Sequence, residues 1–279
     1  MTRTLDDVRD AFHALIVGKL GIRQAYYHGH SLGGATVLGY ALRYPGAVKG
    51  LILEGPAGLE EYPKFMKVGE QTLPICDKSL AHDIRAWRAA YEPLGLITAE
   101  QSRSPQAVRD FFYFKKRDAA GNEIPSSAGY FLRDTEYARL HTDQRIAMIQ
   151  GNRREFEQWA FMFIYDLYSI CSENAQEDAD TLYKRLPQIK APIFLAFGAK
   201  EPFIPGTALN GKQDMSRDII VPFQERMRAA GNRPVVKIYP DAAHFIHTDV
   251  PHEFAQDTVE FMRTGSVEAL SPTVVDSLI

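Results

Sequence analysis

Residues 26–34 read YYHGHSLGG, and this short stretch is the most informative part of the sequence. A serine, Ser31, stands between Gly29 and Gly33, with an apolar run before it and a helix-like run after it. We predict a strand over residues 22–28, a sharp turn at Ser31 and a helix over residues 32–44 that stops before Pro45. Such a turn strains its central residue and crowds its neighbours, which favours glycine on both sides. The pattern therefore indicates an exposed, nucleophilic serine.

The segments on either side of this turn predict a parallel α/β unit. Residues 4–20 are predicted to form a helix that Thr4 caps and that ends at Gly21. Its apolar residues recur at helical spacing and predict one buried stripe: Val8, Phe12, Leu15, Ile16 and Leu20. A further strand is predicted over residues 48–55. Strand, helix and strand in this order favour a parallel pair with a right-handed crossover.

Strand and helix alternate again near the end of the chain. We predict strands over residues 191–198 and 234–240, and helices over residues 218–230 and 251–264. Between residues 56 and 186 we predict helices over 80–91, 104–116 and 143–171, a polar loop over 118–129 and no strand. The chain is thus predicted to have an α/β core over 1–58 and 187–265, a helical cap over 59–186 and a tail over 266–279.

Two later segments, FGAKEPFIP (197–205) and YPDAAHFIHTDVP (239–251), complete a recognisable pattern. Together with GHSLGG they resemble the α/β-hydrolase fold. In that family an acid follows the seventh strand, and Glu201 matches its position between Gly198 and Pro205. The catalytic histidine follows the last strand, and His244 matches it, although Ala243 replaces the usual glycine. The resemblance implies Ser31 as nucleophile, Glu201 as acid and His244 as base, in the chain order that the fold requires.

Other residues remain alternatives for these roles. Glu54 ends the strand after the nucleophile helix, where some members of the family place their acid, and Asp241 is a weaker candidate. His247 stands three residues from His244 and is the alternative base. His30 is expected to pack or hydrogen-bond locally, and His28 to be a strand residue.

The serine arrives early in the chain. In the resembled fold about four strands precede the nucleophile strand, and a loop among them supplies one oxyanion donor. We therefore expect a partial α/β-hydrolase sheet, parallel from the nucleophile strand onward, with a large helical cap. The backbone N–H of Leu32 is the expected oxyanion donor, and a second donor is left open. The nucleophile strand would have an open edge, which favours a homo-oligomer; the alternative is that the sequence is part of a longer parent protein.

Aromatic residues in the second half of the predicted cap are candidates for the substrate pocket, although they equally suit the core of the cap. They are Phe156, Trp159, Phe161, Phe163, Tyr165 and Tyr168. Such a lining favours a small apolar ester, and hence a carboxylic ester hydrolase of the serine esterase type. Amide, lactone or carbon–carbon cleavage would use the same triad. A truncated remnant that acts as an interaction module is the non-enzymatic alternative.

Composition excludes several other classes. The 279 residues include 32 Lys and Arg and 35 Asp and Glu, a net charge of −3, which gives no reason to expect nucleic acid as a partner. The sequence has no apolar run of the ~20 residues that a membrane span needs, and no signal peptide, so we expect a cytoplasmic protein, or an exported one if a longer parent exists. The sequence contains no metal-binding or phosphate-binding motif, so we expect neither a metal nor another cofactor. The pairing of Cys76 and Cys171 is left open.

Overall fold

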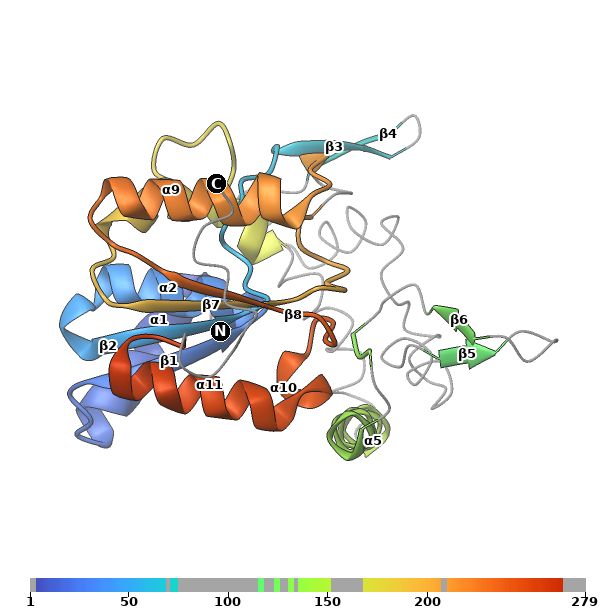
Figure 1. Cartoon of the computed structure of the whole chain (residues 1–279). Helices are drawn as coiled ribbons and strands as arrows, with labels where there is room; N and C mark the ends of the chain where they lie inside the picture. The colour runs from blue at the N-terminus through green and yellow to red at the C-terminus, as the bar shows by residue number, and fades with distance from the viewer. Residues whose placement is uncertain are drawn as a thin grey trace.

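The computed structural model describes residues 4–68, 71–74, 115–117, 123–125, 130–132, 135–151, 168–206 and 210–267. Its centre is a four-stranded, wholly parallel sheet (Figure 1). The strands lie in the order β1 (Ala25–His30), β2 (Val48–Glu54), β7 (Ile193–Gly198) and β8 (Val235–Tyr239). The predicted α/β class and the partial sheet are confirmed.

The long insertion leaves and re-enters the sheet between two neighbouring strands. β2 pairs with β1 on one side, where Tyr27 is opposite Leu51, and with β7 on the other, where Leu53 is opposite Leu195. In the described part of the chain β1 is an edge strand of this sheet. Pairing of that edge with a second chain stays a prediction.

Helices cover both faces of the sheet, because successive side chains of a strand point to opposite sides. Leu51 and Leu53 belong to a core shared with α2 (Leu32–Arg43) and α9 (Val221–Ala229). Ile52, between them, belongs to a second core shared with α11 (Pro251–Thr264). In Figure 1, α9 lies above the sheet and α11 below it. The bounds predicted for α11 are confirmed.

Short elements connect these layers. A turn of 3₁₀ helix, η2 (Pro45–Ala47), leads into β2, and α7 (Leu182–Arg185) with η6 (Leu186–Gln188) leads into β7. The π-helix η7 (Ser216–Ile220) runs directly into α9. After β8, the short helix α10 (Ile246–Asp249) precedes α11.

The N-terminal helix begins as predicted but changes its geometry midway. Thr4 caps α1 (Leu5–His13): its hydroxyl accepts the Asp7 N–H at 3.1 Å, and the Asp7 carboxylate accepts the Thr4 N–H at 3.0 Å. The helix then widens into the π-helix η1 (Ala14–Lys19). Leu15 and Leu20 are 47% and 58% exposed, so the predicted apolar stripe is wrong in its second half. A π turn holds more residues than an α turn, which moves these side chains off the buried face.

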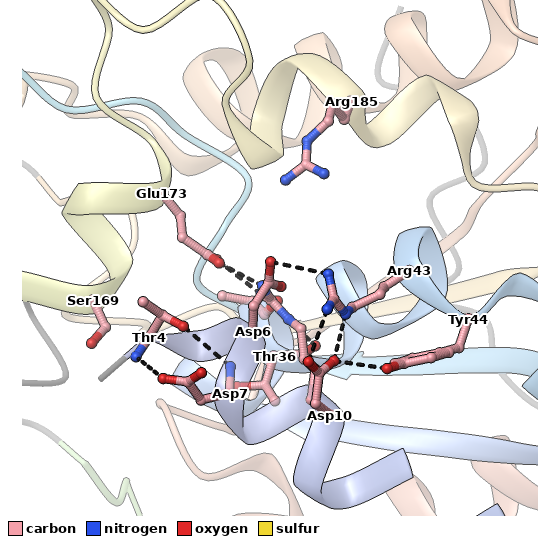
Figure 2. Close-up of polar contacts among 12 residues, drawn as sticks. Thr4, Asp6, Asp7, Asp10, Thr36, Arg43, Tyr44, Ser169, Glu173 and Arg185 are labelled. Carbon is pink, nitrogen blue, oxygen red and sulfur yellow. Dashed lines mark hydrogen bonds and ion pairs between the residues drawn. The ribbon is translucent and has the colours of Figure 1, made fainter. Parts of the chain in front are cut away.

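Arg9, on the buried face of α1, ties three segments together. Its guanidinium donates to the backbone oxygens of Ala35 at 2.7 Å and Thr36 at 3.0 Å, both in α2. It also donates to both carboxylate oxygens of Glu173, at 2.5 and 2.9 Å, and to Asp6 at 2.8 Å. Figure 2 shows the Glu173 carboxylate reaching this cluster from a separate helical segment. The first helix, the nucleophile helix and the end of the insertion therefore share one buried cation.

The insertion contains strands, and the prediction that it has none is wrong. β3 (Phe65–Val68) pairs antiparallel with β4 (Gln71–Pro74), and β5 (Lys115–Arg117) with β6 (Glu123–Pro125). Strands of three or four residues are too short to produce a clear alternating pattern in the sequence. The helix predicted from residue 143 begins earlier, as α5 (Glu136–Gly151). The helix predicted over 80–91, and most of the one over 104–116, lie outside the described residues.

No helix within the described ranges is both long enough and apolar enough to cross a membrane.

Candidate active site

Ser31 occupies a strained backbone position between β1 and α2. Its φ is 55° and its ψ is −123°, a conformation that side-chain-bearing residues rarely adopt. Three backbone hydrogen bonds hold it there: its N–H donates to Glu54 at 3.0 Å, and its carbonyl accepts from Gly34 at 2.8 Å and from Ala57 at 2.9 Å. Such strain persists only where the surrounding contacts fix the residue, which is typical of functional sites.

The glycines around Ser31 differ in how much space a side chain would have at each position. A Cβ on Gly29 would lie 2.5 Å from the backbone oxygen of Gly33, and one on Gly34 would lie 2.3 Å from the Pro56 Cβ. A Cβ on Gly33 would meet nothing within 4 Å. The prediction that crowding requires both flanking glycines is therefore right for Gly29 and wrong for Gly33. Gly34, one residue further on, is the second crowded position.

His244 and Glu201 form a buried pair at the ends of the next strands. Glu201 follows β7 and His244 follows β8, and their side chains are 1% and 3% exposed. The His244 Nδ1 lies 2.8 Å from Glu201 Oε2 and 3.0 Å from Oε1. Since a carboxylate only accepts, Nδ1 carries the hydrogen, and the neutral ring keeps its lone pair on Nε2. The Phe203 N–H, at 2.9 Å from Oε1, holds the carboxylate from the other side.

The carboxyl ends of the strands bring Ser31 and this pair to the same edge of the sheet. Ser31 donates its N–H to Glu54, the last residue of β2, and Gly55 follows directly. A Cβ on Gly55 would lie 2.9 Å from Glu201 Oε2 and 3.2 Å from His244 Nδ1. In a parallel α/β sheet this edge is where ligands bind. The three residues that the sequence proposes for catalysis therefore follow three different strands at one edge.

Glu54, the alternative acid, accepts hydrogen bonds from two histidines other than His244. It is fully buried, and its carboxylate accepts from the His247 ring Nδ1, the His247 backbone N–H and His28 Nε2, each at 2.9 Å. Burial opposes its ionisation, but the hydrogen bonds from His247 and His28 outweigh that and hold the Glu54 pKa well below its usual range. Burial lowers the His247 pKa, and the bond to Glu54 more than reverses this, so the net shift is upward. The alternative acid and the alternative base thus contact each other, and Asp241 is exposed.

His30 does more than the local packing that its place in the sequence predicts. Its Nε2 lies 3.0 Å from the backbone oxygen of His244, 214 positions away in the sequence. Burial and the nearby His244 ring lower the His30 pKa to about 3. The sequence carries no signal for this long-range contact.

An aromatic cluster surrounds the His244 ring. Its ring centroid lies 4.9 Å from that of Phe203, 5.5 Å from that of Phe245 and 5.9 Å from that of Tyr130. Tyr130 belongs to the insertion, and the Phe245 N–H donates to its backbone oxygen at 3.1 Å. Sequence reasoning missed Tyr130 and Phe203 because nothing local indicates that they meet a histidine from the end of the chain.

The other predicted site residues have varied outcomes. Leu32 begins α2, and the N–H groups of a first helical turn have no acceptor within the helix. Tyr168 is buried, and residues 168–173 are helical. Phe156, Trp159, Phe161, Phe163, Tyr165 and Cys76 lie outside the described residues. Within the described part of the chain, no three His, Cys, Asp or Glu residues are grouped so that they could hold a metal ion.

Comparisons with known proteins point in one direction. The sequence model of the alpha/beta hydrolase family matches residues 2–257, nearly the whole chain. A probable hydrolytic enzyme from Pseudomonas aeruginosa PAO1 has a similar structure: the TM-score is 0.54 at 20% identity, over 92% of this chain and 69% of that one.

Two further solved structures have comparable similarity. An esterase from Exiguobacterium antarcticum has a TM-score of 0.51 at 15% identity, over 95% of this chain and 75% of that one. A meta-cleavage product hydrolase from Pseudomonas fluorescens IP01 has a TM-score of 0.50 at 16% identity, over 95% of this chain and 74% of that one. At such identities the similarity establishes the fold alone.

Proposed function

Because this chain belongs to the alpha/beta hydrolase family, we propose that it is a serine hydrolase that cleaves carboxylic esters through Ser31, His244 and Glu201. The observation that carries the proposal is the buried hydrogen bond from His244 Nδ1 to Glu201. It leaves Nε2 as the basic nitrogen of the ring, at the sheet edge that also holds the strained Ser31. Nucleophile, base and orienting acid are the three parts that acyl transfer by serine requires.

In the proposed reaction His244 acts first as a base and then as an acid. Nε2 takes the proton of the Ser31 hydroxyl while Oγ attacks the ester carbonyl, which gives a tetrahedral oxyanion. The imidazolium passes its proton to the departing alcohol oxygen, and the acyl group stays on Ser31. Water then attacks the acyl-enzyme and gives a proton to Nε2; the imidazolium returns this proton to Ser31 Oγ as the bond to the acyl carbon breaks and the carboxylic acid leaves. Glu201 holds the ring in the required tautomer and stabilises its charged form.

The oxyanion would be stabilised at the start of α2. The Leu32 N–H follows the nucleophile directly, and the positive end of the helix dipole lies there. The rings of Phe203, Phe245 and Tyr130 around His244 favour an apolar acyl or aryl group over a charged one. We therefore propose small, neutral, apolar esters as substrates.

Hydrolysis of p-nitrophenyl acetate and butyrate by the purified protein tests this proposal. We expect turnover by the wild type, and a loss to the uncatalysed rate in Ser31→Ala, because the acyl acceptor is gone. A fluorophosphonate probe should label the wild type at Ser31 and leave Ser31→Ala unlabelled. Equal rates in the two proteins would contradict the proposal and favour the non-enzymatic remnant.

The acid is tested with a matched pair of variants in the same assay. Glu201→Gln should lower kcat by about 10⁴, the typical cost of removing the orienting carboxylate, because an amide no longer fixes the His244 tautomer. Glu54→Gln should lower kcat far less, since its carboxylate contacts His247 and His28. The reverse order of effects would move the acid to Glu54.

A further inference from the structure

The residue before the proposed nucleophile is bonded directly to the segment that carries the proposed base. His30 ends β1, and its ring Nε2 lies 3.0 Å from the backbone oxygen of His244. A carbonyl oxygen only accepts, so Nε2 must carry the hydrogen and donate it. Through this bond, and through the peptide that joins His30 to Ser31, the turn of the serine is connected to the loop of the histidine.

The surroundings of the His30 ring keep it in its neutral form. It is packed among three other rings, with centroids 4.3 Å from Phe245, 4.6 Å from His244 and 5.6 Å from His247. Burial and the His244 ring hold its pKa at about 3, so it is neutral wherever an esterase works. A neutral imidazole has one N–H, and the backbone oxygen of His244 accepts its hydrogen bond.

The loop of His244 is held at several neighbouring positions by other groups. The Ala243 N–H donates to Asp249 at 2.9 Å, the Phe245 N–H to Tyr130 at 3.1 Å, and the His247 N–H to Glu54 at 2.9 Å. These contacts fix residues 243, 245 and 247. The contact from His30 fixes residue 244 itself, and it comes from the segment that bears Ser31.

We propose that His30 is a positioning residue that sets the distance between the base and the nucleophile. The inference rests on the proposed function, since it assumes that His244 takes a proton from Ser31. Without the Nε2–H bond, the backbone of His244 loses its connection to the serine turn, so the imidazole can shift relative to the Ser31 hydroxyl. A misplacement of about 1 Å between reacting groups typically costs about 10²-fold in rate.

Two substitutions separate the hydrogen bond from the packing. His30→Leu fills a similar volume without a donor, while His30→Gln places an amide N–H at about the reach of Nε2. For the leucine variant we expect kcat for p-nitrophenyl butyrate to fall about 10- to 100-fold with KM changed less than about threefold, because leucine keeps apolar packing against Phe245. The rate of fluorophosphonate labelling at Ser31 should fall in parallel. The glutamine variant should regain most of both rates.

Thermal unfolding of each variant identifies any loss of fold, and His30→Met replaces the leucine variant if that one does not fold. Wild-type rates in the leucine variant would overturn the inference and leave the esterase proposal standing. Equal losses in the leucine and glutamine variants would also overturn it, since shape rather than the donor would then matter. A wild-type protein that neither cleaves esters nor labels at Ser31 would overturn the proposed function, and the positioning role with it.

Discussion

At the scale of single residues, crowding rather than motif membership decides which glycines around Ser31 are required. The positive φ of Ser31 brings the backbone of Gly33 against Gly29, while Gly33 has open space where a side chain would stand. Two glycines that look equivalent in G-x-S-x-G therefore carry different constraints.

This difference gives a matched pair of variants. Gly29→Ala should destabilise the protein by about 1–3 kcal/mol, because its methyl group would lie 2.5 Å from a backbone oxygen that cannot move freely. Gly33→Ala should be neutral or slightly stabilising, since alanine favours the helix. Urea unfolding of the two variants measures both effects. Equal losses would mean that the turn relaxes around either methyl group.

At the scale of elements, one buried carboxylate joins β2 to β1 and to α10. Glu54 at the end of β2 accepts from His28 on β1 and twice from His247 in α10. Because α10 begins two residues after His244, this carboxylate also holds the loop of the proposed base. The groups are linked by charge as well as by hydrogen bonds, so the stability of this junction depends on pH.

The pH range of that contribution follows from two opposite shifts. The Glu54 pKa is lowered in the folded protein, so its contribution is present above its unfolded pKa of roughly 4.3 and is lost as the pH falls. The His247 pKa is raised, so its contribution is complete below its unfolded pKa of roughly 6.5 and is lost as the pH rises through the folded pKa. The junction should therefore contribute most between about pH 4.5 and 6.5.

Glu54→Gln tests this window. We expect the free energy of unfolding to fall by about 3 kcal/mol at pH 6, because two imidazoles lose a charged acceptor. In the wild type the free energy of unfolding should decline from pH 6 to pH 8, partly because of His247. The variant should lack the part of this decline that comes from His247. Urea titrations at pH 6 and 8 provide the comparison, with Glu225→Gln, at an exposed position of α9, as control. If the free energy of unfolding declines equally from pH 6 to pH 8 in the wild type and in Glu54→Gln, the decline comes from other groups.

At the scale of the whole molecule, a buried cation helps to hold the insertion to the core. Arg9 is 1% exposed, and Glu173, at the end of the insertion, neutralises it with two hydrogen bonds. Burial lowers the Arg9 pKa, but the hydrogen bonds and charges of Glu173 and Asp6 raise it by more, so the net shift is upward. The insertion is thus fixed to α1 as well as to the sheet.

Removing Glu173 should leave a buried cation only partly compensated. We expect Glu173→Ala to lose about 3 kcal/mol of unfolding free energy, the usual cost of breaking a buried pair. Asp10→Ala, which breaks the exposed pair of Asp10 with Arg43, should lose much less and serves as the control. Chemical denaturation of both variants tests the difference, and similar losses would show that the Arg9 pair adds nothing beyond a surface contact.

Local patterns in the sequence predict the elements near the sheet well. The cap at Thr4, the parallel strands, the turn at Ser31 and the final helix all depend on neighbouring residues, and the structure has each of them. The predictions fail where no local pattern exists. The π-helix after His13 and the two short strand pairs of the insertion have no periodic pattern that would predict them.

Local sequence patterns are enough to predict the fold class and the proposed nucleophile, because spacing and glycine placement are properties of adjacent residues. The pairing of each acid with its histidine depends on how the strands are assembled. Glu201 and Glu54 both follow strands of the same sheet, and His244 and His247 lie three positions apart, yet each carboxylate bonds a different ring. The neighbouring strands β2 and β7 end at different places along one edge, so each carboxylate is directed at a different imidazole. Such directions arise only when the strands are assembled.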